Sequence, residues 1–462
     1  MKFKSLKQNI FTPLVSTDEW CKKYPEVDRE YIWSYPLQYG GKPFNPIDIF
    51  RSSDVPLPSL DAVVYIHTPA CLFRCPMCPF YVEVVKSRKD IMGYAKAVIK
   101  ELHMYKKANL TKNLNLNTIY FGGGTATLLY PEDIKEIIDE VKKIIPNKGE
   151  IEITVEGHPC TVDYNYLSSL KAYGVNRVSF GIQSFDQNTL SKLGLKQTVE
   201  QNEKVLKDSI KLGFKTVAAD LLYRTPNQDI KQLKKQLDRF FEFGVHSIST
   251  YSLELSIRQG ILSKQLPSEE MDQKMFYFIN DYMKKKGWVH TAQPDYAHKD
   301  HVQKEILTTW KAPQGQTIGL GAGACSSFNG ANYYNVHDIE EYINVVNEGC
   351  LPVLIGQKFS LEDAMSRYMV LGTRCFEISK VEFEKCFGKK IEEIFSKSLS
   401  YLLSKGLITN EEKYFKVTDK GKYYVDNISK QFYSNNNRNH LQPWGEKMKG
   451  AVASSYLCVY EE

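Results

Sequence analysis

Long apolar runs are missing from this sequence of 462 residues. No stretch reaches about 18 consecutive apolar residues, the length that a transmembrane helix needs. The opening segment, MKFKSLKQNIFTPLV, has neither the long apolar core nor the cleavage site of a secretory signal. We therefore expect a cytoplasmic protein without a membrane span.

Long runs of one charge sign are also missing. Sixty Lys and Arg residues stand against 54 Asp and Glu residues, and the formal net charge of +6 is spread along the chain. Nucleic-acid-binding domains instead gather basic residues on one face or helix. With 42% hydrophobic and 25% charged residues, the composition is that of a globular protein with enough apolar material for a large core.

Cysteine is thinly spread, and only three of the ten cysteines lie close together. Cys71, Cys75 and Cys78 form the motif C-x3-C-x2-C. In a reducing compartment such crowding indicates a metal site or catalysis rather than disulfides. The other seven are isolated, which is typical of small buried side chains. They are Cys21, Cys160, Cys325, Cys350, Cys375, Cys386 and Cys458.

A fourth ligand is missing beside this motif. Thiolates suit either zinc or iron–sulfur clusters. A structural zinc site takes a fourth Cys or His at short spacing, and the following PFYVEVVKSRKD contains neither. An iron–sulfur electron carrier normally takes four thiolates. Three are what a catalytic [4Fe–4S] cluster with one open iron requires, so we favour that cluster, with zinc or plain buried thiols as alternatives.

Short apolar runs alternate with segments of helical spacing through the middle of the chain. The predicted strands cover 62–69, 117–123, 152–157, 177–183, 216–223 and 245–253, each rich in β-branched and aromatic residues. The predicted helices cover 90–107, 131–145, 163–173, 187–213, 228–243 and 268–287. This alternation predicts parallel strands in an α/β barrel or partial barrel over 61–357, with its chemistry at the carboxyl ends of the strands.

The two flanks differ from this pattern. Residues 1–60 contain seven prolines among aromatics, which favours an extended arm. Residues 358–430 predict three helices and a short β-ribbon, like a winged-helix domain, and 431–462 form a tail. The predicted third helix carries Glu392 and Glu393, which suit phosphates poorly. We therefore interpret this domain as a packing or lid domain.

Six motifs in order resemble one family of the radical S-adenosylmethionine superfamily. They are YIHTPACLFRCPMCPFY, IYFGGGTATLL, ITVEGHPCTVD, GVNRVSFGIQSFD, DLLYRTPNQ and IGLGAGACSSFNG. Over residues 60–430 the chain is similar to the oxygen-independent coproporphyrinogen III dehydrogenase family, whose relatives include haem chaperones, haem-degrading enzymes and radical C-methyltransferases. The resemblance implies a partial (β/α)6 barrel with the small winged-helix-like domain behind it.

The resemblance also implies cofactors and a site. Cys71, Cys75 and Cys78 would hold the cluster, and the amine and carboxylate of S-adenosylmethionine would chelate its open iron. An electron from a flavodoxin or ferredoxin-type reductant would then yield a 5′-deoxyadenosyl radical that takes hydrogen from the substrate. By motif position, the residues bordering this cofactor are Tyr65, Gly123 and Glu156. Those matching contacts to a second S-adenosylmethionine are Gly124, Thr125, Gln183 and Asp220.

The residue types at the strand ends agree with a ligand site. Gly122, Gly123 and Gly124 end a predicted strand without side chains, so that backbone can approach a ligand. Glu156 can accept hydrogen bonds from an amine or from ribose hydroxyls. A lone strand histidine such as His67 is more often a hydrogen-bonded core residue than a ligand.

Three departures from the family's pattern bear on function. Phe80 stands two residues beyond Cys78, where the dehydrogenase has a further cysteine. Leu195 replaces an arginine that could grip a carboxylate in a bidentate fork, which weakens the second cofactor site unless Lys196 serves as a point charge. The run EILTTW, ending at Trp310, lacks the histidine of the chaperone branch.

We therefore expect a radical enzyme that acts on a tetrapyrrole or another planar conjugated substrate, by C-methylation or hydrogen abstraction. The alternative within the family is oxidative decarboxylation of coproporphyrinogen III. Alternatives of other classes are a haem-trafficking protein with a vestigial cluster and a zinc-stabilised DNA-binding protein. We expect a monomer whose partners are its small-molecule substrate and its reductant, without nucleic acid.

Overall fold

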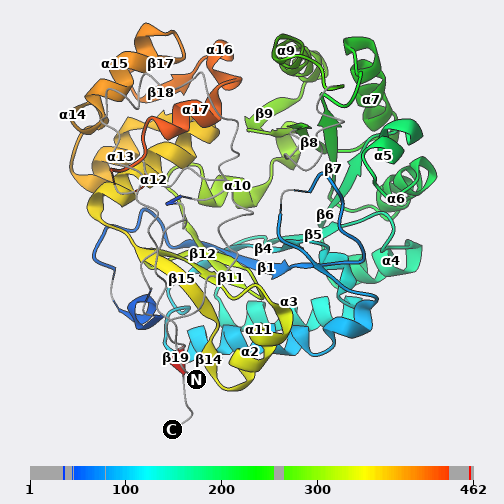
Figure 1. Ribbon diagram of the computed structural model, residues 1–462. Helices are drawn as coiled ribbons and strands as arrows, with labels where there is room; N and C mark the ends of the chain where they lie inside the picture. The colour runs from blue at the N-terminus through cyan, green and yellow to red at the C-terminus, as the bar shows by residue number, and fades with distance from the viewer. Residues whose placement is uncertain are drawn as a thin grey trace.

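The computed structural model describes residues 35–36, 44, 46–51, 53–78, 80–253, 265–435, 437 and 457–458. It confirms the predicted fold class, a partial α/β barrel followed by a small helical domain with a β-ribbon (Figure 1). The predicted arm over 1–60 and the predicted tail over 431–462 lie largely outside the described residues.

Six parallel strands form the centre of a 12-stranded sheet. They are β1 (Asp61–Thr68), β4 (Asn115–Gly123), β5 (Glu152–Gly157), β6 (Arg177–Gln183), β7 (Thr216–Tyr223) and β8 (Ser247–Ser252). Strands that follow one another in this series lie side by side, as strand–helix–strand crossovers favour. The six predicted strands are confirmed, and β5, β6 and β7 have the predicted bounds.

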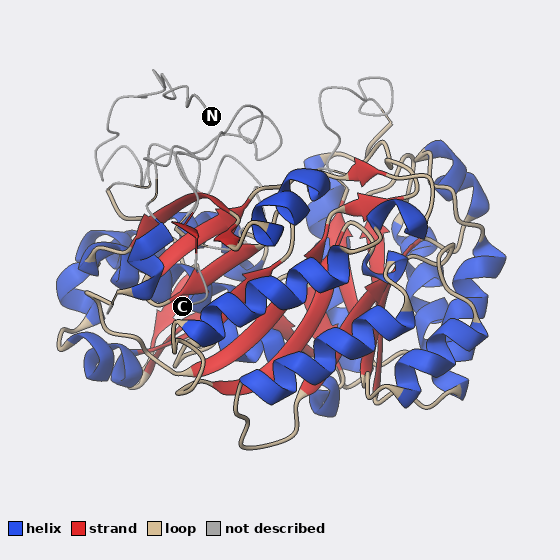
Figure 2. Ribbon diagram, turned by 90° about the horizontal axis from the view of Figure 1, so that it is seen from below, coloured by secondary structure: helices blue, strands red, loops and turns tan. Residues whose placement is uncertain are grey.

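The crossover helices cover the outer face of these strands (Figure 2). They are α2 (Tyr94–Lys107), α3 (Pro131–Ile144), α4 (Tyr164–Ala172), α5 (Gln187–Lys192), α6 (Val199–Lys211), α7 (Ile230–Phe243) and α9 (Glu269–Lys285). The single helix predicted over 187–213 is wrong. Gly194 has a φ of +70°, which a helix does not accept, and the Thr198 hydroxyl accepts a hydrogen bond from the Gln201 amide to start a second helix.

Further strands widen the sheet at both edges. On one side β11 (Gln316–Leu320) runs parallel to β1 and is followed by β12 (Cys325–Phe328), β13 (Ala331–Asn335) and β15 (Val353–Lys358). On the other side lie β10 (Asp295–Ala297) and β9 (Val289–Ala292). The prediction of six strands omits these elements. All five residues of β13 are buried, so the strand lacks the polar alternation by which half-exposed strands are recognised.

One cysteine differs from its interpretation as an isolated thiol. Cys350 is disulfide-bonded. It lies on β14 (Cys350–Leu351), which follows α11 (Ile339–Asn347) and pairs with β19 (Leu457–Cys458) so that Cys350 and Cys458 are Cα partners. Cys160, Cys375 and Cys386 form no disulfide and are half-buried, and Cys325 is likewise half-buried.

The C-terminal domain contains the predicted ribbon with one strand more, and six helices within the described residues where three were predicted. Its helices are α12 (Leu361–Arg374), α13 (Lys380–Phe387), α14 (Ile391–Ile394), α15 (Ser396–Ser404), α16 (Asp419–Lys422) and α17 (Val425–Lys430). The ribbon of β17 (Ile408–Asn410) and β18 (Tyr414–Val417) pairs with β16 (Glu377–Ser379) in a three-stranded sheet. None of the helices in the described residues is long and apolar enough to span a bilayer.

The short helix α10 (Lys304–Thr309) joins the two parts of the molecule (Figure 1). It contacts β1 and β4 on one side, where Thr308 accepts a hydrogen bond from Asn117 at 3.4 Å. Ile306 and the following Trp310 belong to the hydrophobic core of the C-terminal domain. Helix α10 therefore packs against the barrel strands on one side and belongs to the core of the C-terminal domain on the other.

Candidate functional site

The three clustered cysteines lie on a loop that leaves the carboxyl end of β1. Both ends of the loop are held by backbone pairing between β2 (Ala70–Cys71) and β3 (Glu83–Val84). A turn in between closes with the amide of Cys78 donating to the carbonyl of Cys75 at 3.1 Å. All three cysteines are free and half-buried. The paired ends and the internal turn therefore hold the three thiols on one short loop.

The thiols influence one another. Burial raises the pKa of each, and the pKa of Cys75 rises to about 12, first because of burial and then because of Cys78 and Cys71. Positive iron would reverse this effect, since a coordinating thiol is deprotonated. The described residues contain no compact group of three or more His, Cys, Asp or Glu side chains arranged for one metal ion. Three thiols that each bind a different iron of a cluster need no such compact group.

The glycines after β4 form a close cradle against this loop. Gly123 has a φ of +115°, and a Cβ there would lie 2.7 Å from the carbonyl oxygen of Thr68. A Cβ on Gly124 would lie 2.8 Å from the carbonyl oxygen of Ala70 and 2.9 Å from Sγ of Cys71. Only glycine allows this approach. Thr125 follows, with its hydroxyl 3.4 Å from Sγ of Cys71. The donor set and the cradle fit a [4Fe–4S] cluster.

Glu156 reaches the same place from the end of β5. Its carboxylate accepts a hydrogen bond from the Tyr120 hydroxyl at 2.5 Å and one from the Gly123 amide. Burial raises its pKa above the ordinary value. A Cβ on Gly122 would lie 2.9 Å from Oε2 of Glu156 and 3.0 Å from the Tyr65 ring. Five of the predicted site residues therefore meet the cysteine loop or its glycine cradle. These five are Tyr65, Gly123, Gly124, Thr125 and Glu156.

His67 holds Tyr65 in place. The Tyr65 hydroxyl and Nδ1 of His67 lie 2.9 Å apart. Burial lowers the pKa of His67 to about 4, so the ring is neutral and its Nδ1 can accept a hydrogen bond from the Tyr65 hydroxyl. His67 is a hydrogen-bonded residue of the barrel interior, which agrees with its interpretation from the sequence.

Gln183 and Asp220 stand farther along the barrel mouth. Gln183 ends β6 with a φ of +66°, and its side-chain oxygen is buried without a hydrogen-bond partner among the described residues. Asp220 lies on β7, where burial, followed by the charges of Glu156 and Asp295, raises its pKa well above the ordinary value. Asp220 is therefore close enough to Glu156 for the two carboxyls to oppose each other's ionisation.

Leu195 belongs to an apolar cluster beneath the cysteine loop. It is buried with Leu190, Leu193, Leu222 and Leu253, and Cys75 and Met77 pack against the group. Its neighbour Lys196 lies near enough to lower the pKa of Cys75. The side chain that replaces the family's arginine thus supports the loop and offers no charge to a ligand.

Sequence reasoning missed several polar residues of the barrel interior. On the central strands, core residues such as Val64 and Val155 face the helices, so alternate residues face inward. Among them are Arg177 at the start of β6 and Ser249 on β8. Asp295 on β10 and Glu305 on α10 join them. The charge of Asp295 raises the pKa of Asp220, and the charge of Glu156 raises the pKa of Glu305. Glu305 lies in the EILTTW run, so an acidic residue at that point was the available signal.

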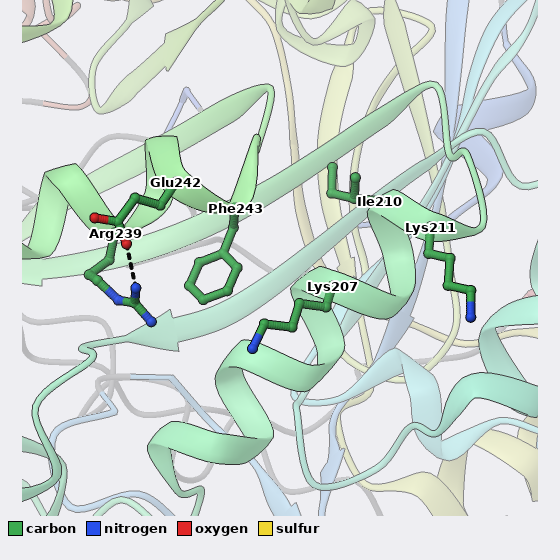
Figure 3. Close-up of a pocket in the computed structure, with 6 residues that line it drawn as sticks. All are labelled: Lys207, Ile210, Lys211, Arg239, Glu242 and Phe243. Carbon is green, nitrogen blue, oxygen red and sulfur yellow. Dashed lines mark hydrogen bonds and ion pairs between the residues drawn. The ribbon is translucent and has the colours of Figure 1, made fainter.

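A surface hollow of about 400 Å³ lies elsewhere (Figure 3). Its lining residues come from the last turns of α6 and α7, which end at the edge of the sheet opposite the cysteines. They are Lys207, Ile210, Lys211, Arg239, Glu242 and Phe243. Arg239 pairs with Glu203 and Glu242, and Lys207 also pairs with Glu203. These contacts indicate a charged surface between two helices, separate from the chemistry of the loop.

Comparisons with known proteins agree with the motif analysis. Residues 65–248 match the Radical SAM superfamily, and residues 359–424 match the HemN C-terminal domain. The heme chaperone HemW of Bacillus subtilis is 28% identical over 366 residues, covering 78% of this chain and 95% of the relative. An oxygen-independent coproporphyrinogen III oxidase of Cereibacter sphaeroides is 25% identical over 353 residues, covering 72% of this chain and 77% of the relative.

A solved structure has the same fold. The coproporphyrinogen III oxidase HemN from Escherichia coli, a radical SAM enzyme, superposes with a TM-score of 0.75 at 20% identity. The superposition covers 87% of this chain and 96% of that one.

The loop with the three thiols lies within the part of the chain, residues 65–248, that matches the Radical SAM superfamily. The second matched domain and the curated relatives show that the chain is similar to HemN and HemW proteins. The resemblance drawn from the motifs is confirmed. The cofactors of the family are a [4Fe–4S] cluster and S-adenosylmethionine, as predicted.

Proposed function

We propose that this protein is a radical enzyme that uses S-adenosylmethionine to take hydrogen from, or to C-methylate, a tetrapyrrole or another planar conjugated substrate. The observation that carries the proposal is the set of three free thiols against the Gly123–Gly124 cradle. When bound there, the cluster supplies the electron that converts S-adenosylmethionine to a 5′-deoxyadenosyl radical.

The chain's own residues bind and orient the cofactors. Cys71, Cys75 and Cys78 hold the cluster. The backbone of Gly123 and Gly124 admits the cofactor close to the loop, because no side chain intervenes. Glu156, fixed by the Tyr120 hydroxyl, accepts hydrogen bonds from the methionyl amine or the ribose.

The relatives support the substrate class. They carry names that refer to haem and to coproporphyrinogen III, and both are tetrapyrroles. Leu195 lies within an apolar cluster, which leaves the second S-adenosylmethionine position without a guanidinium. Decarboxylation of coproporphyrinogen III is therefore a less favoured outcome of the same radical chemistry.

Anaerobic reconstitution tests the proposal. Protein loaded with iron and sulfide, and reduced chemically or by a flavodoxin, should convert S-adenosylmethionine to 5′-deoxyadenosine. Cys71→Ala, Cys75→Ala and Cys78→Ala should each abolish this product, whereas Cys386→Ala in the C-terminal domain should retain it. A cluster-loaded wild-type protein that forms no 5′-deoxyadenosine would contradict the proposal.

The products distinguish the possible outcomes. S-adenosylhomocysteine beside 5′-deoxyadenosine indicates methyl transfer, and carbon dioxide released from coproporphyrinogen III indicates decarboxylation. The similarity to a heme chaperone favours one further candidate, haem trafficking. Tight stoichiometric haem binding without cofactor cleavage would support that candidate instead.

A further inference from the structure

Helix α12 carries two buried arginines, and only one of them has a carboxylate partner among the described residues. Arg374 pairs with Asp426. Arg367, two turns earlier, is 8% exposed and donates from Nη1 to the Tyr35 carbonyl at 2.5 Å. Within the described part of the chain, its Nε and Nη2 form no hydrogen bond and no carboxylate pairs with it. Buried charges are normally paired, so the free side of this guanidinium favours an anionic ligand.

The nearest carboxylate along the helix is already used. Asp363 lies one turn before Arg367, at the spacing where ion pairs form on a helix. Its two carboxylate oxygens instead accept hydrogen bonds from Ser360, Ser434 and Asn437. Burial lowers the pKa of Arg367 to about 10, so the guanidinium keeps its positive charge at neutral pH. Helix α12 itself therefore does not compensate this charge.

Arg367 lines a cavity of about 30 Å³ between the C-terminal domain and the barrel. A space of about 10–15 Å³ admits one water molecule, so this cavity admits a group of a few non-hydrogen atoms. Ala364 lines it from the C-terminal domain, and Gln314 and Gln316 line it from the barrel side. The ring of Phe359 forms another wall, with its centroid 5.9 Å from Cζ of Arg367. Apolar walls lower the local dielectric constant, which strengthens the attraction between opposite charges.

The polar side chains of the wall are neutral, and the two glutamines are already hydrogen-bonded. Gln314 donates from Nε2 to the Tyr368 carbonyl at 3.1 Å. Gln316 accepts a hydrogen bond from the Asn329 amide at 2.9 Å. Among the described residues that line the cavity, Arg367 alone is charged. The cavity therefore favours an anion over a cation.

The cavity lies away from the cysteine loop. Gln316 begins β11 and is the Cα partner of Ala62 near the start of β1, whereas the cysteine loop leaves the carboxyl end of β1. Because β1 and β11 run parallel, the cavity and the loop lie toward opposite ends of these strands. A ligand in the cavity would contact both parts of the molecule without touching the cofactor residues.

We propose that this cavity is a binding site for a small monovalent carboxylate anion, held by the guanidinium of Arg367 at the junction of the barrel and the C-terminal domain. The planar fork of a guanidinium can donate two parallel hydrogen bonds to the oxygens of one carboxylate. The size of the cavity limits the ligand, so formate is small enough to enter and benzoate is too large. The site does not depend on the proposed radical chemistry.

Calorimetric titration of the cluster-loaded full-length protein with sodium formate tests the proposal. Wild type should bind one formate per chain, and sodium benzoate at the same ionic strength should not bind. Arg367→Gln should weaken formate binding at least about tenfold, because it removes the charge-assisted hydrogen bonds. Ala364→Val keeps the guanidinium but narrows the cavity, so it should also weaken binding. The exposed Lys389→Gln removes a positive charge from the same domain and should keep the wild-type affinity.

The wild-type titrations and Ala364→Val keep the proposal testable if Arg367→Gln fails to unfold cooperatively in urea. No saturable binding of formate by wild type, or equal binding of benzoate, would overturn the proposal. An unchanged formate affinity in folded Arg367→Gln would also overturn it. Loss of formate binding in Arg367→Gln, with the affinity retained in Lys389→Gln, would support the site whether or not the protein forms 5′-deoxyadenosine.

Discussion

A single methyl group added at Gly124 would collide with the cysteine loop. Its Cβ would lie 2.8 Å from the Ala70 carbonyl oxygen and 2.9 Å from Sγ of Cys71, and the backbone cannot yield as a flexible side chain can. We expect Gly124→Ala to displace the loop and to lower the iron and sulfide bound on reconstitution several-fold. Gly149→Ala, where a Cβ meets nothing within 4 Å, is the control. Equal iron content in both variants would contradict the prediction.

The raised pKa of Glu305 predicts that its ionisation lowers the free energy of unfolding. Burial, with smaller contributions from Asp295, Glu152 and Glu156, raises its pKa from 4.5 to about 7. As pH rises between these values, the unfolded chain releases the proton before the folded chain does, so folding loses up to about 3 kcal/mol. The cost is absent below the unfolded pKa and complete above the folded one.

Glu305→Gln should remove this cost and keep the hydrogen bond from Thr309. The gain in unfolding free energy over wild type should therefore be larger at pH 8 than at pH 5, by about 1–3 kcal/mol. Urea denaturation at both pH values measures it, with the exposed Glu348→Gln as the control. A gain that is the same at both pH values would show that Glu305 ionises normally.

At this scale the sequence indicated the ligands better than their surroundings. The spacing of Cys71, Cys75 and Cys78 depends on local chain geometry alone, which a motif records. Glu305 is different, because the direction of a side chain on a helix of six residues is set by what the helix packs against. The sequence EILTTW shows that an acidic residue is present, but it does not show that its side chain lies near Glu156.

Among the elements, α12 is tied to the barrel through a buried cation. Arg374 ends this helix with its side chain fully buried, paired with Asp426 of α17. It also donates to the Gln293 carbonyl at 2.6 Å and lies 5.0 Å from the Trp310 ring centroid. The guanidinium of this α12 residue therefore contacts α17, Trp310 and the loop between β9 and β10.

Asp426→Ala should destabilise the protein by about 3–5 kcal/mol, because it leaves a buried charge without its carboxylate. Asp419→Ala removes an exposed partner of Lys422 and should cost less than about 1 kcal/mol. The midpoints of urea unfolding compare the two. Similar small losses in both variants would show that Arg374 is compensated by its other contacts.

The elements predicted correctly are those whose boundaries are marked by nearby residues in the sequence. Strands β5, β6 and β7 were found with their bounds because turn residues and helices frame them in the sequence. The split between α5 and α6 depends on the positive φ of Gly194, whose Cβ position lies 2.8 Å from the Pro76 ring. That contact joins segments far apart in the chain, so only the tertiary structure shows why the helix ends there.

For the whole molecule, we expect cofactor binding to raise the melting temperature. The site joins the loop after β1 to the ends of β4 and β5, so a ligand there links strands that must separate on unfolding. At a concentration about 100 times its Kd, S-adenosylmethionine should stabilise the cluster-loaded protein by about 2.7 kcal/mol. Calorimetry should show a rise in Tm for wild type and for Cys386→Ala, and none for Cys75→Ala. A rise of the same size in Cys75→Ala would place the ligand elsewhere.

Helix α10 contacts both the barrel and the C-terminal domain, which affects how proteins of this fold can diverge. Glu305 faces the barrel, while Ile306 and Trp310 are packed in the core of the small domain. A substitution in that distant core can therefore rotate or shift the helix and move the Glu305 carboxyl relative to the barrel strands. Selection acting on the C-terminal domain could retune the preference of the barrel while every strand residue stays the same.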